Sequence, residues 1–146
     1  MHVNGESDLI IMIEIIKGFI FFSILIYASS CDMKTREVPN HVHIMILITA
    51  FIGISPQKLL GMCLGALLVP LPLLVSTLIT PDSIGGADIK IMAACAFVLG
   101  FERGLAALIL GLAVGVVATV IINGKPKGKF PMVPYLTVGS IAVFFV

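Results

Sequence analysis

Long apolar runs separated by short polar breaks make up most of this 146-residue chain. Hydrophobic residues are 59% of the sequence and charged residues only 12%, whereas about a quarter of the residues in a soluble domain are charged. A small soluble domain keeps a large surface and cannot hide so much apolar material from water. Lipid is the solvent that these runs fit, and we expect an all-α integral membrane protein.

Six apolar runs are candidates for membrane crossings. They cover Leu9–Ser30, Val42–Ser55, Leu59–Thr80, Ile89–Phe101, Gly104–Ile122 and Pro131–Val146. The second and fourth are shorter than the roughly 20 residues of a usual transmembrane helix. We expect that they either extend into polar flanking residues or lie where the protein thins the bilayer. Pro70 and Pro72 should kink the third run. We therefore expect about six transmembrane helices in a compact bundle, as a single membrane-embedded domain over residues 1–146.

The first run has an alternative interpretation, because Ala28-Ser29-Ser30-Cys31 is similar to the processing site of a lipoprotein signal. A signal peptide has basic residues ahead of a short apolar core. Here Glu6 and Asp8 precede a long core. We therefore expect a retained transmembrane helix.

Lysine and arginine predict the orientation in the membrane. With the N-terminus outside, the inner side carries Lys34, Arg36, Lys90, Lys125, Lys127 and Lys129. The outer side carries only Lys58 and Arg103. The positive-inside rule then favours this topology, with both polar breaks, Cys31–Asn40 and Pro81–Asp88, on the cytoplasmic side.

Charge and cysteine usage argue against several classes of function. A net charge of +1 offers no basic surface for nucleic acid. The three cysteines form no C-x-x-C pair, so no zinc or redox motif is predicted. His41 and His43 lie two apart and on different faces of a helix, which does not favour a shared metal. We expect no metal and no other cofactor.

Acidic residues at the cytoplasmic ends of the runs are the candidates for chemistry. Asp32 ends the first run and Asp88 opens the fourth, and ionisable groups at such places are functional candidates. Two carboxylates held together can share one proton, so that one acts as general base and the other as general acid. Asp82 is interpreted as a turn residue and Glu37 as a solvated loop charge.

Each of these residues also has a purely structural interpretation. Asp32 and Arg36 are spaced for a helical ion pair. Asp88 could cap the helix that follows it, and Gly85-Gly86 could be a simple turn. Because intramembrane carboxylates also serve transport, spacing alone leaves these alternatives open.

Two segments resemble the signatures of one family, the prepilin peptidases, which are GxGD-type intramembrane aspartyl peptidases. The segment Cys31-Asp32-Met33-Lys34-Thr35-Arg36-Glu37-Val38-Pro39-Asn40 is similar to D-x-x-x-R-x-I/V-P-N, and Gly85-Gly86-Ala87-Asp88-Ile89-Lys90 is similar to G-x-G-D-x-K. The stretch from Lys129 to Tyr135 resembles the family's last, proline-containing helix start. The three segments occur in the family's order and extend over nearly the whole chain.

The resemblance implies an endopeptidase that removes the leader of type IV prepilins or pseudopilins at the cytoplasmic membrane face, without a metal. It implies that Asp32 and Asp88 are the catalytic pair. Gly85, Gly86, Arg36 and Lys90 would bind substrate or support the site, although plain positive-inside anchoring also explains the two cations. The expected partners are a prepilin or pseudopilin and membrane lipids, and no nucleic acid. No oligomeric state is predicted.

Two departures from the family pattern refine these expectations. Ala87 replaces the second glycine of G-x-G-D, and its methyl group makes a positive φ costly. The cysteine-rich methyltransferase insertion of the larger members has no counterpart here. We therefore expect a short form without N-methyltransferase activity, like members that process Flp-type or archaeal pilins. Asn40 is expected to cap the second helix.

Two other classes of function compete with the peptidase. In a small transporter, Asp32 and Asp88 would carry ions, but transporters commonly contain internal repeats, which we do not find. A non-catalytic assembly factor would have no need for two aspartates in these motif contexts.

Overall fold

The computed structural model describes residues 5–81, 84–123 and 131–146, and the regular elements in these ranges are all helices. They are α1 (Gly5–Thr35), α2 (Asn40–Ala50), α3 (Pro56–Leu68), α4 (Leu71–Ile79), α5 (Gly86–Leu99), α6 (Phe101–Asn123) and α7 (Val133–Phe144). Because α3 and α4 belong to one apolar stretch, Pro56–Ile79, the helices correspond to the six expected runs. The all-helical prediction is confirmed.

Three of the helical stretches are long and apolar enough to cross a membrane: Gly5–Thr35, Pro56–Ile79 and Phe101–Ile122. The helices α2 and α7 are shorter and apolar. Large apolar side chains face outward, as Phe19, Leu78 and Ile121 show with exposed fractions of 76%, 74% and 76%. A water-soluble monomer does not leave apolar surface of this extent uncovered, so the helices indicate an integral membrane protein.

The predicted kink in the third run is a break between two helices. α3 ends at Leu68 and α4 begins at Leu71, on either side of Pro70. Pro70 and Pro72 have no N–H to donate, and a proline ring clashes with the carbonyl group one turn earlier. Leu73 is the one buried residue of α4, so this half of the stretch packs loosely against the bundle.

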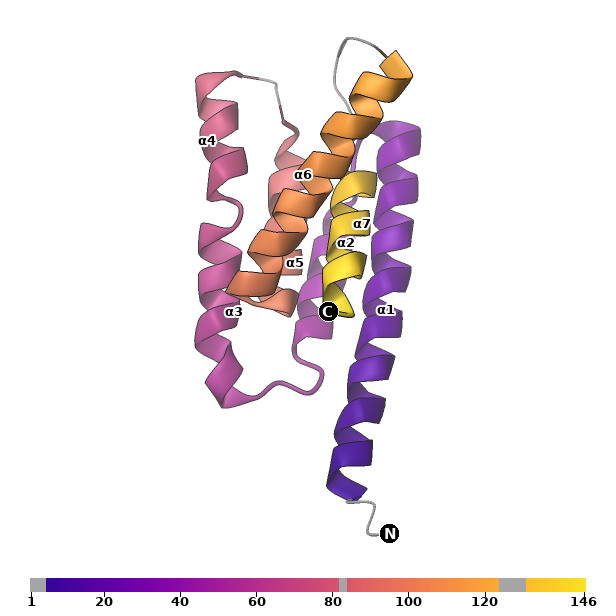
Figure 1. Ribbon diagram of the computed structural model, residues 1–146, viewed down its shortest axis with the longest axis vertical. Helices are drawn as coiled ribbons and strands as arrows, with labels where there is room; N and C mark the ends of the chain where they lie inside the picture. The colour runs from indigo at the N-terminus through magenta and orange to yellow at the C-terminus, as the bar shows by residue number, and fades with distance from the viewer. Residues whose placement is uncertain (1–4, 82–83, 124–130) are drawn as a thin grey trace.

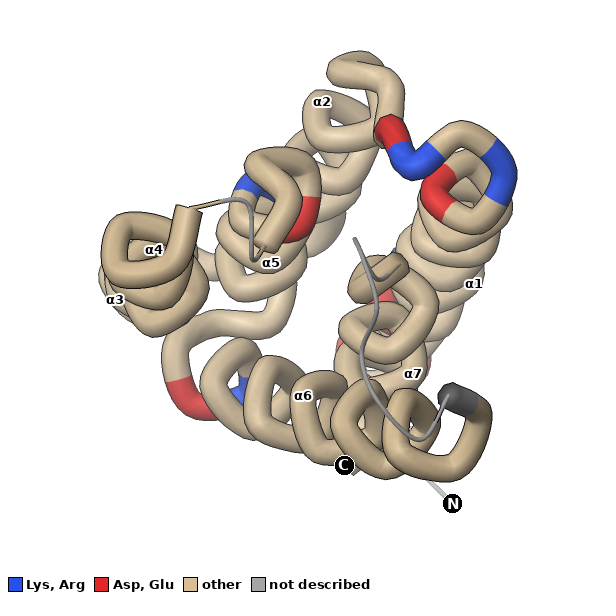
Figure 2. Tube along the Cα trace, turned by 90° about the horizontal axis from the view of Figure 1, so that it is seen from above, with Lys and Arg blue, Asp and Glu red and all other residues tan. Residues whose placement is uncertain are grey.

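The middle of the bundle is α5, which contacts α2, α3, α6 and α7. Figure 2 shows the other helices around it, and Figure 1 shows that the first turns of α1 extend beyond the bundle. Close approach depends on glycine: a Cβ on Gly65 of α3 would lie 2.7 Å from the carbonyl oxygen of Ala96 on α5. The same holds between α6 and α7, where Gly111 faces Leu136.

The second helix begins differently from our prediction. Pro39 is the N-cap, Asn40 is the first helical residue, and no side chain caps the helix. Pro39 has φ −59° and ψ 142°, the extended geometry that an N-cap takes. Because Pro39 occupies that position, Asn40 is carried into the helix, and the expected Asn40 cap is wrong.

Candidate active site

Asp32 lies in the last turn of α1 and is buried, with 5% of its surface exposed. Its carboxylate accepts a hydrogen bond from the backbone N–H of Val133, the first residue of α7. The first N–H groups of a helix have no partner inside the helix, so they are available to an anion. The Oδ2 atom of Asp32 is buried and has no hydrogen-bond partner among the described residues.

Asp88 is the third residue of α5 and is also buried, with 6% exposed. Its carboxylate accepts a hydrogen bond from the backbone N–H of Gly85, the N-cap of α5. The helix therefore starts at Gly86, three residues before the run Ile89–Phe101. Asp88 is not the N-cap, but it does bind back to the helix start in the manner of a capping box.

Gly85 brings the backbone close to the Asp88 carboxylate. A Cβ on Gly85 would lie 3.1 Å from Asp88 Oδ2, which is tighter than an ordinary contact. Its φ is −69°, a value that any residue can adopt. Glycine is therefore favoured here because it has no side chain to crowd the carboxylate, and not because of its backbone freedom. Gly86 and Ala87 are already helical, and the positive φ that Ala87 was expected to disfavour is not needed.

The charge of Asp32 acts on Asp88 electrostatically. Asp88 precedes the apolar run of α5, and burial raises its pKa to about 7. The negative charge of Asp32 adds to this rise, and the Gly85 N–H opposes it. For Asp32, burial disfavours the charged form, whereas the Val133 N–H and the charge of Arg36 favour it. Figure 2 shows acidic segments on α1 and α5 at the same end of the bundle.

The predicted supporting residues lie at this end but are solvent-facing. Arg36 follows α1 in a left-handed conformation with φ 56°. Its backbone N–H donates to the carbonyl oxygen of Asp32, and its charge acts on the Asp32 carboxylate. Arg36, Gly86, Lys90 and Glu37 are all exposed. Asp82 and the segment from Lys125 to Phe130 lie outside the described residues. Among the residues described, no three His, Cys, Asp or Glu side chains gather into a metal-binding group.

Sequence reasoning missed the contribution of α7. The donor to Asp32 is a backbone N–H, which has no sequence signature, although Pro134 in the first turn of α7 is typical of a helix start. One turn further along, Thr137 Oγ1 and Ser29 Oγ are hydrogen-bonded at 3.1 Å. Neither hydroxyl is part of a motif that we could identify.

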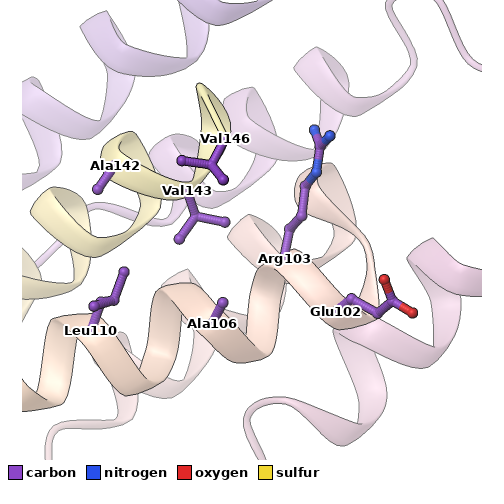
Figure 3. A pocket seen from close by; sticks show the side chains of 7 residues that line it. All are labelled: Glu102, Arg103, Ala106, Leu110, Ala142, Val143 and Val146. Atoms are coloured by element: carbon purple, nitrogen blue, oxygen red, sulfur yellow. The ribbon is translucent and has the colours of Figure 1, made fainter.

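A small apolar pocket lies at the opposite end of the bundle, between the start of α6 and the end of α7 (Figure 3). Its lining is Glu102, Arg103, Ala106, Leu110, Ala142, Val143 and Val146. In Figure 3 the charged groups of Glu102 and Arg103 point away from the apolar side chains. The pocket is therefore separate from the aspartate pair.

The sequence is similar to those of known proteins. The chain is similar to the prepilin leader peptidase/N-methyltransferase of Bacillus subtilis (strain 168), with 30% identity over 145 residues, which cover 92% of this chain and 57% of the relative. The chain thus spans little more than half the length of that relative. No solved structure matches it. Residues 19–122, which include Asp32 and Asp88, match the type IV leader peptidase family, and the chain belongs to that family.

Proposed function

We propose that this protein is an intramembrane aspartyl endopeptidase that removes the leader of type IV or Flp-like prepilins, with Asp32 and Asp88 as its catalytic pair. The observation that carries the proposal is the pair itself: two buried aspartates at one end of the bundle, each accepting an N–H from a helix start, with the charge of Asp32 acting on Asp88. Membership of the type IV leader peptidase family supports the choice of a prepilin as substrate.

The chemistry follows from the different surroundings of the two carboxylates. With a pKa raised to about 7, Asp88 retains its proton near neutral pH and serves as the general acid. Asp32 serves as the general base: it takes a proton from water while the water oxygen attacks the carbonyl carbon of the scissile peptide. Asp88 donates its proton to the carbonyl oxygen. As the gem-diol intermediate collapses, one hydroxyl proton returns to Asp88 and the C–N bond breaks. Asp32 passes the proton that it took from water to the leaving nitrogen, so both carboxyl groups regain their starting states.

The distribution of cations supports a cytoplasmic site. Lys34, Arg36 and Lys90 belong to the end of the bundle that holds Asp32 and Asp88, whereas Lys58 and Arg103 lie at the starts of α3 and α6, at the other end. The positive-inside rule puts the first group in the cytoplasm and the N-terminus outside. Cleavage then occurs at the inner face of the cell membrane, within one membrane-embedded domain.

The absence of a cysteine cluster supports cleavage without methylation. Cys31, Cys63 and Cys95 are unpaired and differ in burial, with only Cys95 buried. The connection between α1 and α2 is a short segment, from Arg36 to Pro39. We therefore propose that the chain carries leader peptidase activity and no N-methyltransferase activity.

The test is leader removal from a Flp-type prepilin by the purified protein in detergent, followed by mass spectrometry. We expect cleavage after the glycine that precedes the substrate's apolar helix. Asp32→Asn and Asp88→Asn should each lower the rate by at least about a hundredfold, the lower range for loss of an acid–base group. Both variants should elute as the wild type does in gel filtration. Cleavage that survives both substitutions would refute the site, and a folded wild type inactive on a panel of prepilins would refute the function.

A further inference from the structure

The interface between α1 and α7 has a polar end and an apolar end. At the polar end, Asp32 accepts the N–H of Val133. At the apolar end, the ring of Phe144 lies 5.9 Å from that of Phe21 and 5.3 Å from that of Phe22, between ring centroids. These rings bury apolar surface between the two helices, whereas the directional contacts of the interface are its hydrogen bonds.

The hydrogen bond between Ser29 and Thr137 lies about one helical turn from Asp32, toward the apolar end of the interface. Ser29 precedes Asp32 by three residues in α1, and Thr137 follows Val133 by four in α7. Because residues three or four apart lie on one face of a helix, both polar contacts belong to the same interface. Thr137 is 5% exposed, so its hydroxyl is largely withdrawn from solvent.

The position of Asp32 depends on this register. The Val133 N–H orients its carboxylate, and Oδ2 has no hydrogen-bond partner among the described residues. Each residue of a helix advances about 1.5 Å and turns about 100°, so a small slide or rotation of α1 against α7 would separate the carboxylate from the N–H. A hydrogen bond between short side chains resists such a movement because its geometry is narrow.

We propose that the Ser29–Thr137 hydrogen bond is a positioning contact: it fixes α1 against α7 and thereby aims Asp32 at the substrate. The proposal rests on the proposed function, because it assigns these residues a role in leader cleavage. Neither hydroxyl touches the reacting atoms.

The kinetic test removes each hydroxyl and compares kcat with KM on a Flp-type prepilin. Ser29→Ala and Thr137→Val should each lower kcat about fivefold, the factor that one typical hydrogen bond is worth, with KM changed less than twofold. The double variant should be no slower than either single variant, because both remove the same bond. Thr137→Ser keeps a hydroxyl and should retain most of the wild-type kcat.

Thr49→Val is the matched control. Thr49 is also buried, at 1% exposed, but its hydroxyl donates to the carbonyl of Met45 in its own helix. It should keep the wild-type kcat. An equal loss in Thr49→Val, a change in KM alone, or multiplicative losses in the double variant would overturn the proposal.

A second readout does not depend on activity. Spin labels are placed at Met33→Cys on α1 and Val138→Cys on α7, both exposed positions, after Cys31, Cys63 and Cys95 are replaced by alanine. The distance distribution should broaden in Thr137→Val and stay narrow in Thr49→Val. If the wild type is inactive but the distance distribution still broadens in Thr137→Val, the proposed function alone is refuted. If the wild type is active and Thr137→Val changes neither the kinetics nor the distances, the positioning role alone is refuted.

Discussion

Arg36 holds a backbone conformation that suits glycine better than arginine. Its φ is 56°, directly after α1 ends at Thr35, and a left-handed conformation costs a residue with a side chain roughly 1 kcal/mol. Arg36→Gly should therefore raise the free energy of unfolding by up to about 1 kcal/mol. The same change should slow leader cleavage, because the charge of Arg36 favours the ionised form of Asp32. Urea unfolding in detergent measures the change in stability, and the rate of leader cleavage measures the effect of the lost charge.

Two further substitutions at this position separate strain from charge. Arg36→Lys keeps both the cation and the strain, so stability and cleavage should stay near wild type. Arg36→Asn tolerates the left-handed conformation without the cation, and it should behave like the glycine variant. A glycine variant that is less stable than wild type would show that the strain argument is wrong, and full activity in it would remove Arg36 from the site.

At this same scale, the sequence identified residues better than it identified their partners. Asp32 and Asp88 could be selected because each stands in a motif and at the end of an apolar run. The Val133 N–H could not, because every residue other than proline has an N–H and only the packing of α7 on α1 brings this one to Asp32. The structural alternative for Asp88 was partly right, since the residue does bind the N-terminus of its own helix.

Between elements, α6 and α7 approach each other closely at Gly139, and this predicts a sharp difference between two helical glycines. A Cβ on Gly139 would overlap the carbonyl oxygen of Ala107 and lie 2.7 Å from the backbone nitrogen of Gly111. Gly139→Ala should therefore push the helices apart and cost about 1–3 kcal/mol of stability. Because α7 also carries Val133, cleavage should fall with it. Thermal unfolding in detergent measures the first effect.

Gly61→Ala is the matched control for this prediction. Gly61 lies in α3, and an added Cβ meets nothing within 4 Å. Alanine is the better helix former, so this variant should melt at or slightly above the wild-type temperature. Comparable destabilisation by both substitutions would mean that glycine is needed for a reason other than close helix packing.

The extent of the helices was predictable where the apolar pattern alone decides it. α2 and α5 are short, as the lengths of their runs predicted. The start of α5 was misplaced by three residues, because Gly86, Ala87 and Asp88 are not apolar and yet continue the helix. Gly65 and Gly111 meet a neighbouring helix closely, whereas Gly61 does not. The sequence cannot distinguish these glycines, because the difference between them is whether another helix packs against them.

For the whole molecule, the raised pKa of Asp88 predicts how stability changes with pH. In the unfolded chain this carboxyl ionises near pH 4, whereas in the folded protein its pKa is about 7. Between these values the folded state binds more protons than the unfolded state, so stability falls as pH rises from about 4 to about 7 and then levels off. Asp88→Asn removes the ionisable group. Its melting temperature should exceed that of the wild type by more at pH 8 than at pH 5.

The control for the pH prediction is Asp8→Asn, at an exposed position in the first turn of α1. It should shift the melting temperature equally at both pH values. If the Asp88→Asn advantage were the same at pH 5 and pH 8, the carboxyl would not be held protonated by the fold, and Asp88 would lose its assignment as the general acid. A larger advantage at pH 8 would instead mean that the protein gives up stability at neutral pH to keep a buried acid at the end of the bundle that also holds Asp32. That is the arrangement that peptide hydrolysis by two carboxylates requires.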